Sequence, residues 1–485
     1  MKTNVKKVSE PVFTAPGAVA SHINSELQLR RTVMACMLWE NIAYEDGISV
    51  AERIGTLIKK IDPETVAKIA IEARNEMKLR HVPLLIVREM ARLETHRYLV
   101  SQTLNSIIQR PDELAEFISI YWKEKKEPLS AQVKKGLAMA FTKFNEYQLA
   151  KYNKDGAIKL RDVLFLCHAK PGDKAQEKLW KKLVDGKLAI PDTWEVALSA
   201  SDGENKKEIW ERLLKEDKIP AMAFIRNLRN FKKEGVSEEL VNEGFKNLKT
   251  DRILPFRFIT AAANAPEFEP QLDKAMERSM SQVSRLPGKT ILIVDVSGSM
   301  TSRVSGKSEV SRLDTAASLA ILTRGICEDV KVYATGGNDF TRVHKTSLVP
   351  ARTGMALRDV VREQVSKLGG GGIFLKQCID YVYELEKTAD RIIVITDEQD
   401  CDTACKSPDK ANTFGKANYL INISSERNGV GYGKWTHIDG WSEHVIEYIA
   451  QAENIKPHKA EKMGVKNKIV SQNTANKVRK NKRTR

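Results

Sequence analysis

Long apolar runs and paired cysteines are missing from this chain of 485 residues. No apolar stretch reaches the ~18 residues that a bilayer-spanning helix needs, and Met1 to Ala20 lacks the continuous apolar core of a signal peptide. The six cysteines show no CxxC spacing, which argues against a zinc module or a disulfide framework. We therefore expect a cytoplasmic protein with free thiols and no membrane partner. Cys401 and Cys405 are a weaker candidate for a redox or metal pair.

Catalytic motifs are missing as well. The sequence has no nucleophile motif, no Cys/His metal quartet and no carboxylate cluster of the kind that two-metal nucleases use. The four glycines Gly369 to Gly372 suggest a phosphate-binding loop, but the Lys-Ser/Thr pair that would follow them is absent. The sequence therefore predicts a binding protein, and an RNA-processing enzyme is the least favoured alternative.

Charge is distributed unevenly along the chain. Residues 1–285 carry 48 basic and 40 acidic side chains, residues 286–455 carry 20 and 22, and residues 456–485 carry 11 and 1. A polyanionic partner is therefore expected at the first and last segments. We expect a mobile N-terminus over 1–24, a helical domain over 25–285, an α/β domain over 286–455 and a disordered basic tail over 456–485. The tail is either a nucleic-acid arm or a solubilising segment.

Helical periodicity runs from about Ser25 to about Met280 with hardly any strand-like alternation. Asp62-Pro63 is a typical helix start, because Asp62 can cap the helix and Pro63 suits its first position. Similar starts are expected at Pro111, at Asp192 with Glu195 as a capping box, at Pro220 and at Ser237. Many short helices in pairs favour an α-solenoid of the HEAT-repeat kind, although no clean sequence period is present.

A different pattern begins near residue 286. The apolar run Ile291 to Val294 predicts a buried parallel strand, and the carboxyl end of such a strand is where open α/β sheets place ligands. Asp295, Ser297 and Ser299 follow it directly. One carboxylate and two hydroxyls favour Mg²⁺ or Mn²⁺ over zinc. A Ser/Gly turn without any ligand is the alternative.

Further apolar runs, separated by helix-length segments, are Val330 to Ala334, Arg391 to Thr396 and Tyr419 to Ile423. This alternation predicts a doubly wound α/β domain, so that the whole chain is a multidomain α plus α/β protein. Asp397 comes at the carboxyl end of one of these runs. We therefore expect it beside Asp295, in direct or water-mediated contact with the ion.

Two groups of cations in the helical region are candidates for phosphate contact. Arg226, Arg229 and Lys233 lie at i, i+3 and i+7, so that they share one helix face; a solvated face is an equal alternative. His168 and Lys170 come just past an apolar helix. The helix dipole repels phosphate at that end, so any contact there would come from the side chains.

Several separated segments resemble a TROVE domain: Gly136-Leu137-Ala138, Leu166 to Pro171, Thr193-Trp194-Glu195, Met222 to Asn230 and Ile253 to Arg257. The Asp-x-Ser-x-Ser order at Asp295 resembles the metal-ion-dependent adhesion site (MIDAS) of von Willebrand factor A domains. A TROVE domain followed by an A domain is the layout of the Ro autoantigen family. The resemblance covers about residues 25 to 450.

The resemblance implies a ring of helical repeats closed by the A domain. It also implies a monomeric, non-catalytic scaffold for RNA quality control, with a central hole for single-stranded 3′ ends of misfolded structured RNAs and an outer basic surface for Y-like RNA. A 3′ exoribonuclease is a further candidate partner. By carry-over, the implied RNA-binding residues are His168, Lys170, Arg226 and Arg229, with Arg74, Arg80, Lys135 and Lys143 as looser matches.

One position departs from the A-domain pattern. A threonine is expected after a glycine pair in the second metal loop, whereas Ile373 follows Gly369 to Gly372 here. Water would have to fill that position, so weak metal binding, or none, is expected at Asp295, Ser297, Ser299 and Asp397. A metal-assisted A domain that binds a partner's carboxylate stays open as a further alternative to the RNA scaffold.

Overall fold

A computed structural model of the chain describes residues 10–453, apart from 37, 40–43, 200–204, 251–252, 254, 281–284, 404–407, 415–416 and 442–443. The predicted basic tail over 456–485 and Cys405 lie outside the described residues. No described helix is long and apolar enough to cross a membrane.

The first body of helices follows the start signals of the sequence closely. Asp62 accepts a hydrogen bond from the backbone N–H of Thr65 at 2.9 Å, and Pro63 opens the helix as predicted. The elements are α1 (Ser25–Met34), α2 (Gly47–Ile58), α3 (Pro63–Asn75), α4 (His81–Arg92), η1 (Glu94–Leu99), α5 (Val100–Ile107), α6 (Asp112–Tyr121), α7 (Ala131–Phe141), α8 (Glu146–Tyr152), α9 (Leu160–Leu166) and α10 (Lys174–Val184).

A second row of helices follows a short connection after Val184. The elements are α11 (Trp194–Ser199), α12 (Lys206–Lys215), α13 (Ala221–Lys233), α14 (Glu238–Asn247), α15 (Pro255–Asn264), η2 (Pro266–Phe268) and α16 (Glu269–Met280). The predicted cap of α11 is wrong by one residue. Thr193 Oγ1 accepts the hydrogen bond from Val196 N at 3.3 Å, because the carboxylate of Asp192 is paired with Lys218 at 2.5 Å.

The α/β domain is built on a six-stranded sheet in the order β3-β2-β1-β4-β5-β6. Neighbouring strands are parallel except for β2 and β3. The strands are β1 (Leu286–Asp295), β2 (Cys327–Asn338), β3 (Val343–Leu348), β4 (Arg391–Thr396), β5 (Ala417–Asn422) and β6 (Thr436–Asp439). The four predicted strands are confirmed, whereas β3 and β6 were not predicted. The strand order reverses between β1 and β4, which makes their carboxyl ends the switch point of the sheet.

Helices cover both faces of this sheet, as the doubly wound prediction requires. Alternate residues of β1 face opposite ways: Ile291 and Ile293 belong to the core under α19, and Leu292 and Val294 to the core under α17, α18 and α20. The bounds are η3 (Gly298–Thr301), α17 (Arg312–Ile326), α18 (Gly354–Lys367), α19 (Leu375–Leu385), η4 (Pro408–Lys410) and α20 (His444–Ala452).

The hydrophobic cores divide the chain differently from the charge pattern. One core runs through the first body of helices, from Leu29 to Leu183. Another joins the second row of helices to the sheet without a break, from Trp210 to Ala450. The boundary expected at residue 286 therefore falls inside a continuous core. The described apolar packing changes instead between Leu183 and Trp210.

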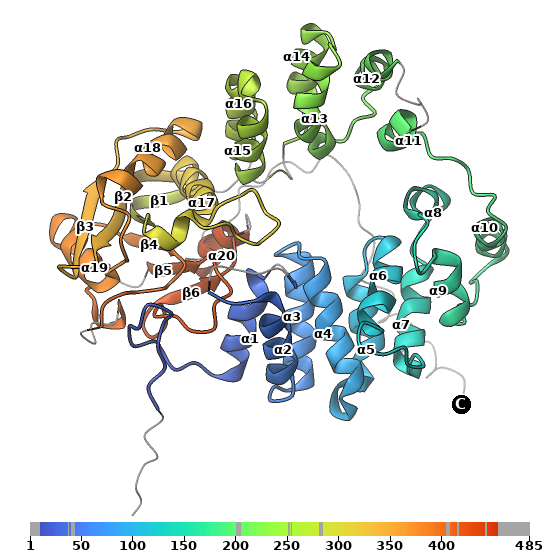
Figure 1. Cartoon of the computed structure of the whole chain (residues 1–485), viewed down its shortest axis with the longest axis horizontal. Coiled ribbons are helices and arrows are strands. Elements are labelled where there is room, and N and C mark those ends of the chain that lie inside the picture. The colour runs from blue at the N-terminus through green and yellow to red at the C-terminus, as the bar shows by residue number, and fades with distance from the viewer. Residues whose placement is uncertain are drawn as a thin grey trace, which may run out of the picture.

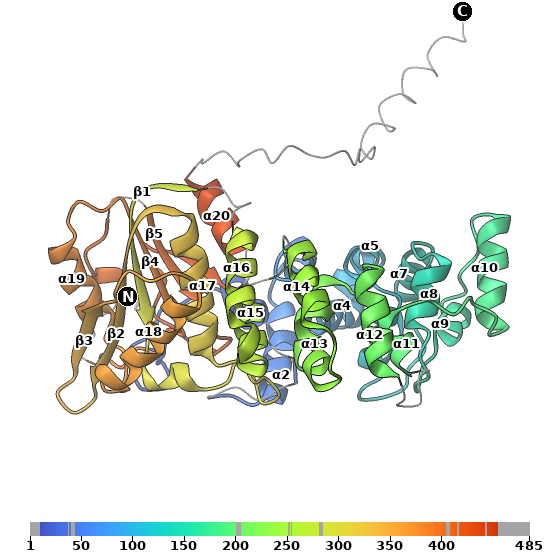
Figure 2. The same ribbon diagram turned by 90° about the horizontal axis from the view of Figure 1, so that it is seen from above.

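The helices close into a flat ring with the α/β domain, as Figures 1 and 2 show. At one end α15 and α16 pack on α17, and at the other α1 contacts β6. Residues 10–24, expected to be mobile, instead lie along the α/β domain. Thr14 Oγ1 donates to the carbonyl of Asp400 at 2.9 Å, and Ser21 N donates to the carbonyl of Gly429 at 2.9 Å.

Candidate functional site

The predicted metal loops meet at the switch point of the sheet. Asp295 ends β1 and Asp397 follows β4, and the two strands are neighbours. Both side chains are fully buried. The hydroxyls of Ser297 and Ser299 lie 3.2 Å apart in the turn after β1. The structure therefore brings the four predicted ligand residues to one edge of the sheet.

Donors from the protein already surround the carboxylate of Asp295. Its Oδ1 accepts a hydrogen bond from Ser297 N at 2.8 Å, and its Oδ2 accepts one from Thr396 Oγ1 at 2.6 Å. Burial raises the pKa of Asp295 to about 7, and the nearby carboxylate of Asp397 adds to this shift.

The second metal loop approaches the first by its backbone. Gly298 N donates to the carbonyl of Gly371 at 3.1 Å, and a side chain at Gly298 would lie 2.7 Å from the carbonyl of Gly370. Ile373 is fully buried in the core under α19, and it pairs with Asp400 in an isolated β-bridge. Its side chain is part of that apolar core, so the position holds no metal ligand.

One of the predicted metal ligands, Asp397, is already paired with a buried arginine. Arg312 Nη1 donates to Asp397 Oδ2 at 2.7 Å, and Arg312 Nη2 donates to Glu426 Oε1. The exposed fractions of Arg312, Asp397 and Glu426 are 1%, 0% and 2%. No group of three or more His, Cys, Asp or Glu spaced to hold a metal occurs in the described part of the chain. Because the carboxylate of Asp397 already pairs with Arg312, the residues at this edge fit a divalent cation poorly.

The α/β domain also meets the first helices beside this site. Arg31 of α1 forms a buried ion pair with Glu398. The same carboxylate contacts His437 Nε2 at 2.8 Å, and His437 Nδ1 lies 3.4 Å from Asp439. The ring of Tyr432 stacks on His437 with centroids 3.9 Å apart. We call this contact of Arg31 in α1 with Glu398, Tyr432, His437 and Asp439 the seam.

The residues of the seam and Arg312 were all missed from the sequence. Arg31 and Glu398 are 367 positions apart, and Arg312 and Glu426 are 114 apart. Charged residues are usually exposed, so nothing in the local pattern predicts that these are buried. The one available signal is the apolar composition of α17, which is buried along nearly its whole length and therefore also buries the residue at its start.

The predicted RNA-binding residues fall into two groups. The exposed ones without an acidic partner among the described residues are His168, Lys170, Arg226, Arg229 and Lys135. His168 takes a left-handed conformation with φ 53° directly after the C-cap of α9. His168 and Lys170 lie between α9 and α10, whereas Arg226 and Arg229 lie on α13. Figure 1 shows these elements in different parts of the ring.

The other predicted cations are occupied within the protein. Arg74 is buried and donates to Glu113 at 2.7 Å, and Arg80 pairs with Asp112 at 3.2 Å and with Glu116. Lys143 donates to the last carbonyls of α5, including that of Ile108 at 2.5 Å. These contacts give Arg74, Arg80 and Lys143 structural roles in the helical body.

Two arginines, Arg226 and Arg257, lie on the contacting helices α13 and α15 of the second row. Burial lowers the pKa of Arg257, at the start of α15, and the charge of Arg226 on α13 lowers it further. Arg229 lies one turn away from Arg226 and is exposed. Like charges on neighbouring helices favour an anion between them. The sequence had singled out Arg226 and Arg229 but not Arg257.

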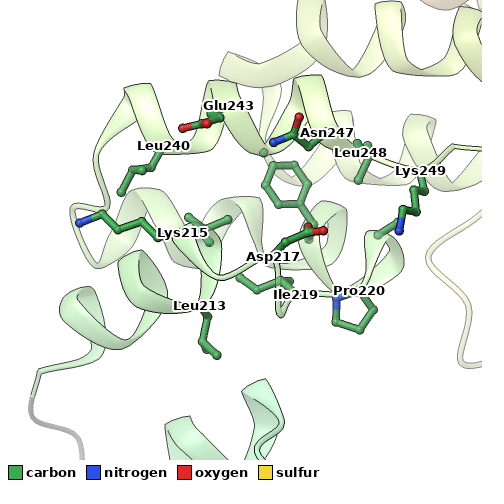
Figure 3. A pocket seen from close by; sticks show the side chains of 14 residues that line it. Leu213, Lys215, Asp217, Ile219, Pro220, Leu240, Glu243, Asn247, Leu248 and Lys249 are labelled. Carbon is green, nitrogen blue, oxygen red and sulfur yellow. The ribbon is translucent and has the colours of Figure 1, made fainter.

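A cavity of about 340 Å³ opens nearby between α12, α13 and α14. Figure 3 shows apolar side chains around its floor, with Lys215 and Lys249 at opposite ends. Asp217 and Glu243 also line it. The rim is balanced in charge, so this cavity does not favour a phosphate over a cation.

Known proteins match this chain in both of its parts. Residues 27–186 and 176–348 match the TROVE domain, and residues 289–414 match the Ro60 vWA domain. The fold resembles the crystal structure of the Deinococcus radiodurans Ro (RSR) protein, with a TM-score of 0.55 and 16% identity over 89% of this chain and 100% of that one.

Two curated relatives are the Telomerase protein component 1 of Mus musculus and of Rattus norvegicus. They are 23% and 24% identical over 356 and 323 residues, which is 54% and 48% of this chain. The chain spans only 13% and 12% of the length of these relatives. Together, the two domain matches show that the chain belongs to the Ro family of RNA-binding ribonucleoproteins, which joins a TROVE domain to a von Willebrand factor A domain.

Proposed function

We propose that the protein is a non-catalytic scaffold for RNA quality control with two RNA sites. Single-stranded 3′ ends of misfolded structured RNAs bind within the ring, near Arg226 and Arg229. Small Y-like RNA binds on the outer basic surface that includes His168 and Lys170. A 3′ exoribonuclease is the partner class that this role calls for, since the sequence offers no nuclease motif of its own.

The observation that supports this proposal is that Arg226 and Arg257 lie on the contacting helices α13 and α15, close enough for the charge of Arg226 to lower the pKa of Arg257. Like charges on neighbouring helices repel each other, and a phosphate bound between them lowers that repulsion. Arg229 extends the same face towards solvent. A strand whose phosphates follow these cations would be held by its backbone and not by its base sequence.

A crossed design with two RNAs tests the two-site arrangement. One ligand is a hairpin with a single-stranded 3′ tail, and the other is a Y-like stem-loop without a tail. We expect Arg226→Ala with Arg229→Ala to weaken the tailed hairpin roughly tenfold or more, because two phosphate contacts are lost. His168→Ala with Lys170→Ala should weaken the Y-like RNA more than the tailed hairpin. Affinities are measured at one physiological salt concentration.

The matched control removes two positively charged side chains that already pair with carboxylates of the protein. Arg212 pairs with Glu216 at 2.9 Å and Lys218 pairs with Asp192 at 2.5 Å, so Arg212→Ala with Lys218→Ala should change both affinities little. Equal losses for both RNAs in both test variants would contradict two separate sites. Equal affinity of the parent for blunt duplex and tailed hairpin would contradict binding of 3′ ends.

A further inference from the structure

Three buried charged side chains lie next to one another at the carboxyl ends of β1 and β4, where the metal site was predicted. Asp397 accepts from one end of the Arg312 guanidinium at 2.7 Å, and Glu426 accepts from the other end. We infer that Arg312 and Glu426 take the places that an A domain gives to its metal ion and to a partner's carboxylate. All groups of this site then come from the chain itself. We call the contact of Arg312 with Asp397 and Glu426 the joint.

The Arg312 guanidinium and a divalent ion exclude each other at this site, because both are positively charged. Arg312 is 1% exposed, so a second cation beside it would meet its charge with little water between them. Two carboxylates around one guanidinium compensate the positive charge of Arg312, and Arg312 in turn compensates one of their two negative charges. Adding an ion would therefore require Arg312 to leave.

The position of Arg312 in α17 supports this assignment. The helix begins with a capping box in which Ser311 Oγ accepts from Asp314 N at 3.0 Å, and Arg312 is its first residue. The amino end of a helix disfavours a cation, because the helix dipole is positive there. A buried arginine at this place is explained by the two carboxylates that it holds.

Glu426 is fixed from the helical side of the ring. Its backbone carbonyl accepts a hydrogen bond from Arg31 Nε at 2.7 Å, and the neighbouring carbonyl of Ser425 accepts one from Arg53 Nη2 at 2.8 Å. Its Oε2 is buried without a hydrogen-bond partner among the described residues. An internal carboxylate with one oxygen unpaired is held in place chiefly by its contact with Arg312.

The first helices also cover the site. Tyr44, just before α2, hydrogen-bonds to Ser299, and its ring centroid lies 5.9 Å from the Arg312 guanidinium carbon. A carboxylate of another protein would have to displace both Tyr44 and Glu426 to reach this edge. The joint therefore links the α/β domain to the first helices without a divalent metal and without an external partner.

Thermal unfolding of the full chain tests the inference. The parent should melt at the same temperature in EDTA and in millimolar Mn²⁺. Arg312→Met should lower the melting temperature by roughly 3–10 °C, because it leaves two buried carboxylates without a cation. Adding Asp397→Asn and Glu426→Gln to Arg312→Met should restore at least half of that loss, and this triple variant should fold even where the single variant does not.

Arg391→Met is the matched control. Arg391 is a buried cation of the same domain that pairs with Glu453 and donates to Thr290 Oγ1 at 2.7 Å. Its loss should not be rescued by Asp397→Asn with Glu426→Gln. The inference is overturned if Mn²⁺ raises the melting temperature of the parent, if Arg312→Met melts like the parent, or if the triple variant is no more stable than the single one.

Discussion

His437 is the residue whose charge state matters most for the seam. Burial alone would lower the pKa of His437, but the carboxylates of Asp439 and Glu398 raise it to about 9. Burial would likewise raise the pKa of Glu398, but Arg31 and His437 lower it to about 2. At neutral pH the seam therefore contains two cations and two carboxylates.

The sign of the pH dependence follows from these shifts. The raised pKa of His437 contributes stability that is fully present below about pH 6.5 and is lost as the pH rises through about 9. The lowered pKa of Glu398 contributes stability that is present above about pH 4.5 and is lost as the pH falls through about 2. We expect the free energy of unfolding to fall by up to ~3 kcal/mol between pH 6.5 and 9 because of His437.

Urea unfolding of the parent and of His437→Gln at both pH values checks this prediction. Glutamine keeps a polar side chain but cannot titrate, so the variant should be less stable than the parent at pH 6.5 and nearly equal to it at pH 9. A stability difference that stays constant between the two pH values would show that the charge of His437 contributes nothing.

The sequence predicted which residues lie at the carboxyl ends of β1 and β4, but it did not predict what those residues do. Asp295 and Asp397 were placed correctly, because each follows an apolar run and parallel strands end together. Arg312 and Glu426 decide what those carboxylates do, and they come from segments that carry no such pattern. The same limit applies to Arg74, which looks like a surface cation in the sequence and is buried against Glu113.

At the scale of the elements, the segment Glu10 to Asn24 is a strap across the α/β domain. Besides its bond to Asp400, Thr14 Oγ1 accepts a hydrogen bond from Ala18 N at 3.0 Å, and Ala15 N donates to Gln399 Oε1 at 2.9 Å. Thr14 and Ala18 are buried. The strap is therefore held by specific polar contacts to the loop that follows β4.

Thr14→Val should lower the free energy of unfolding by about 1–2 kcal/mol, because a buried carbonyl and a buried N–H lose their partner at nearly constant side-chain volume. It should also speed proteolytic cleavage of the strap. Thr56→Val is the control, since that hydroxyl donates to the carbonyl of Glu52 on an exposed helix face. Unchanged cleavage rates in both variants would show that the strap does not depend on Thr14.

Strands with continuous apolar runs could be read from the sequence, and the others could not. β1, β4 and β5 are buried along most of their length, which is why their runs were visible. β3 is an edge strand that alternates between exposed and half-buried residues, and β6 has only four residues. Neither gives a pattern that differs from a loop.

At the scale of the whole molecule, we expect the basic tail over 456–485 to add charge to RNA binding without adding a preference for any base sequence. It carries 11 basic side chains and 1 acidic one. We expect its deletion to weaken binding of all RNAs by a similar factor and to flatten the slope of log affinity against log salt by several units, because each lost phosphate contact reduces that slope by ~0.7–0.9. Titrations at four salt concentrations measure it. An unchanged slope would place the tail outside the RNA interface.

The seam also determines when the ring can close during synthesis of the protein. Arg31 leaves the ribosome hundreds of residues before Glu398, Glu426 and His437 exist, so α1 emerges with its charged partners missing. Helices α1 to α10 share a core of their own and can pack during synthesis, whereas the last contacts of the ring must wait for β6. For most of translation the ring is therefore an open arc, and it closes only after the last strand of the sheet has been made.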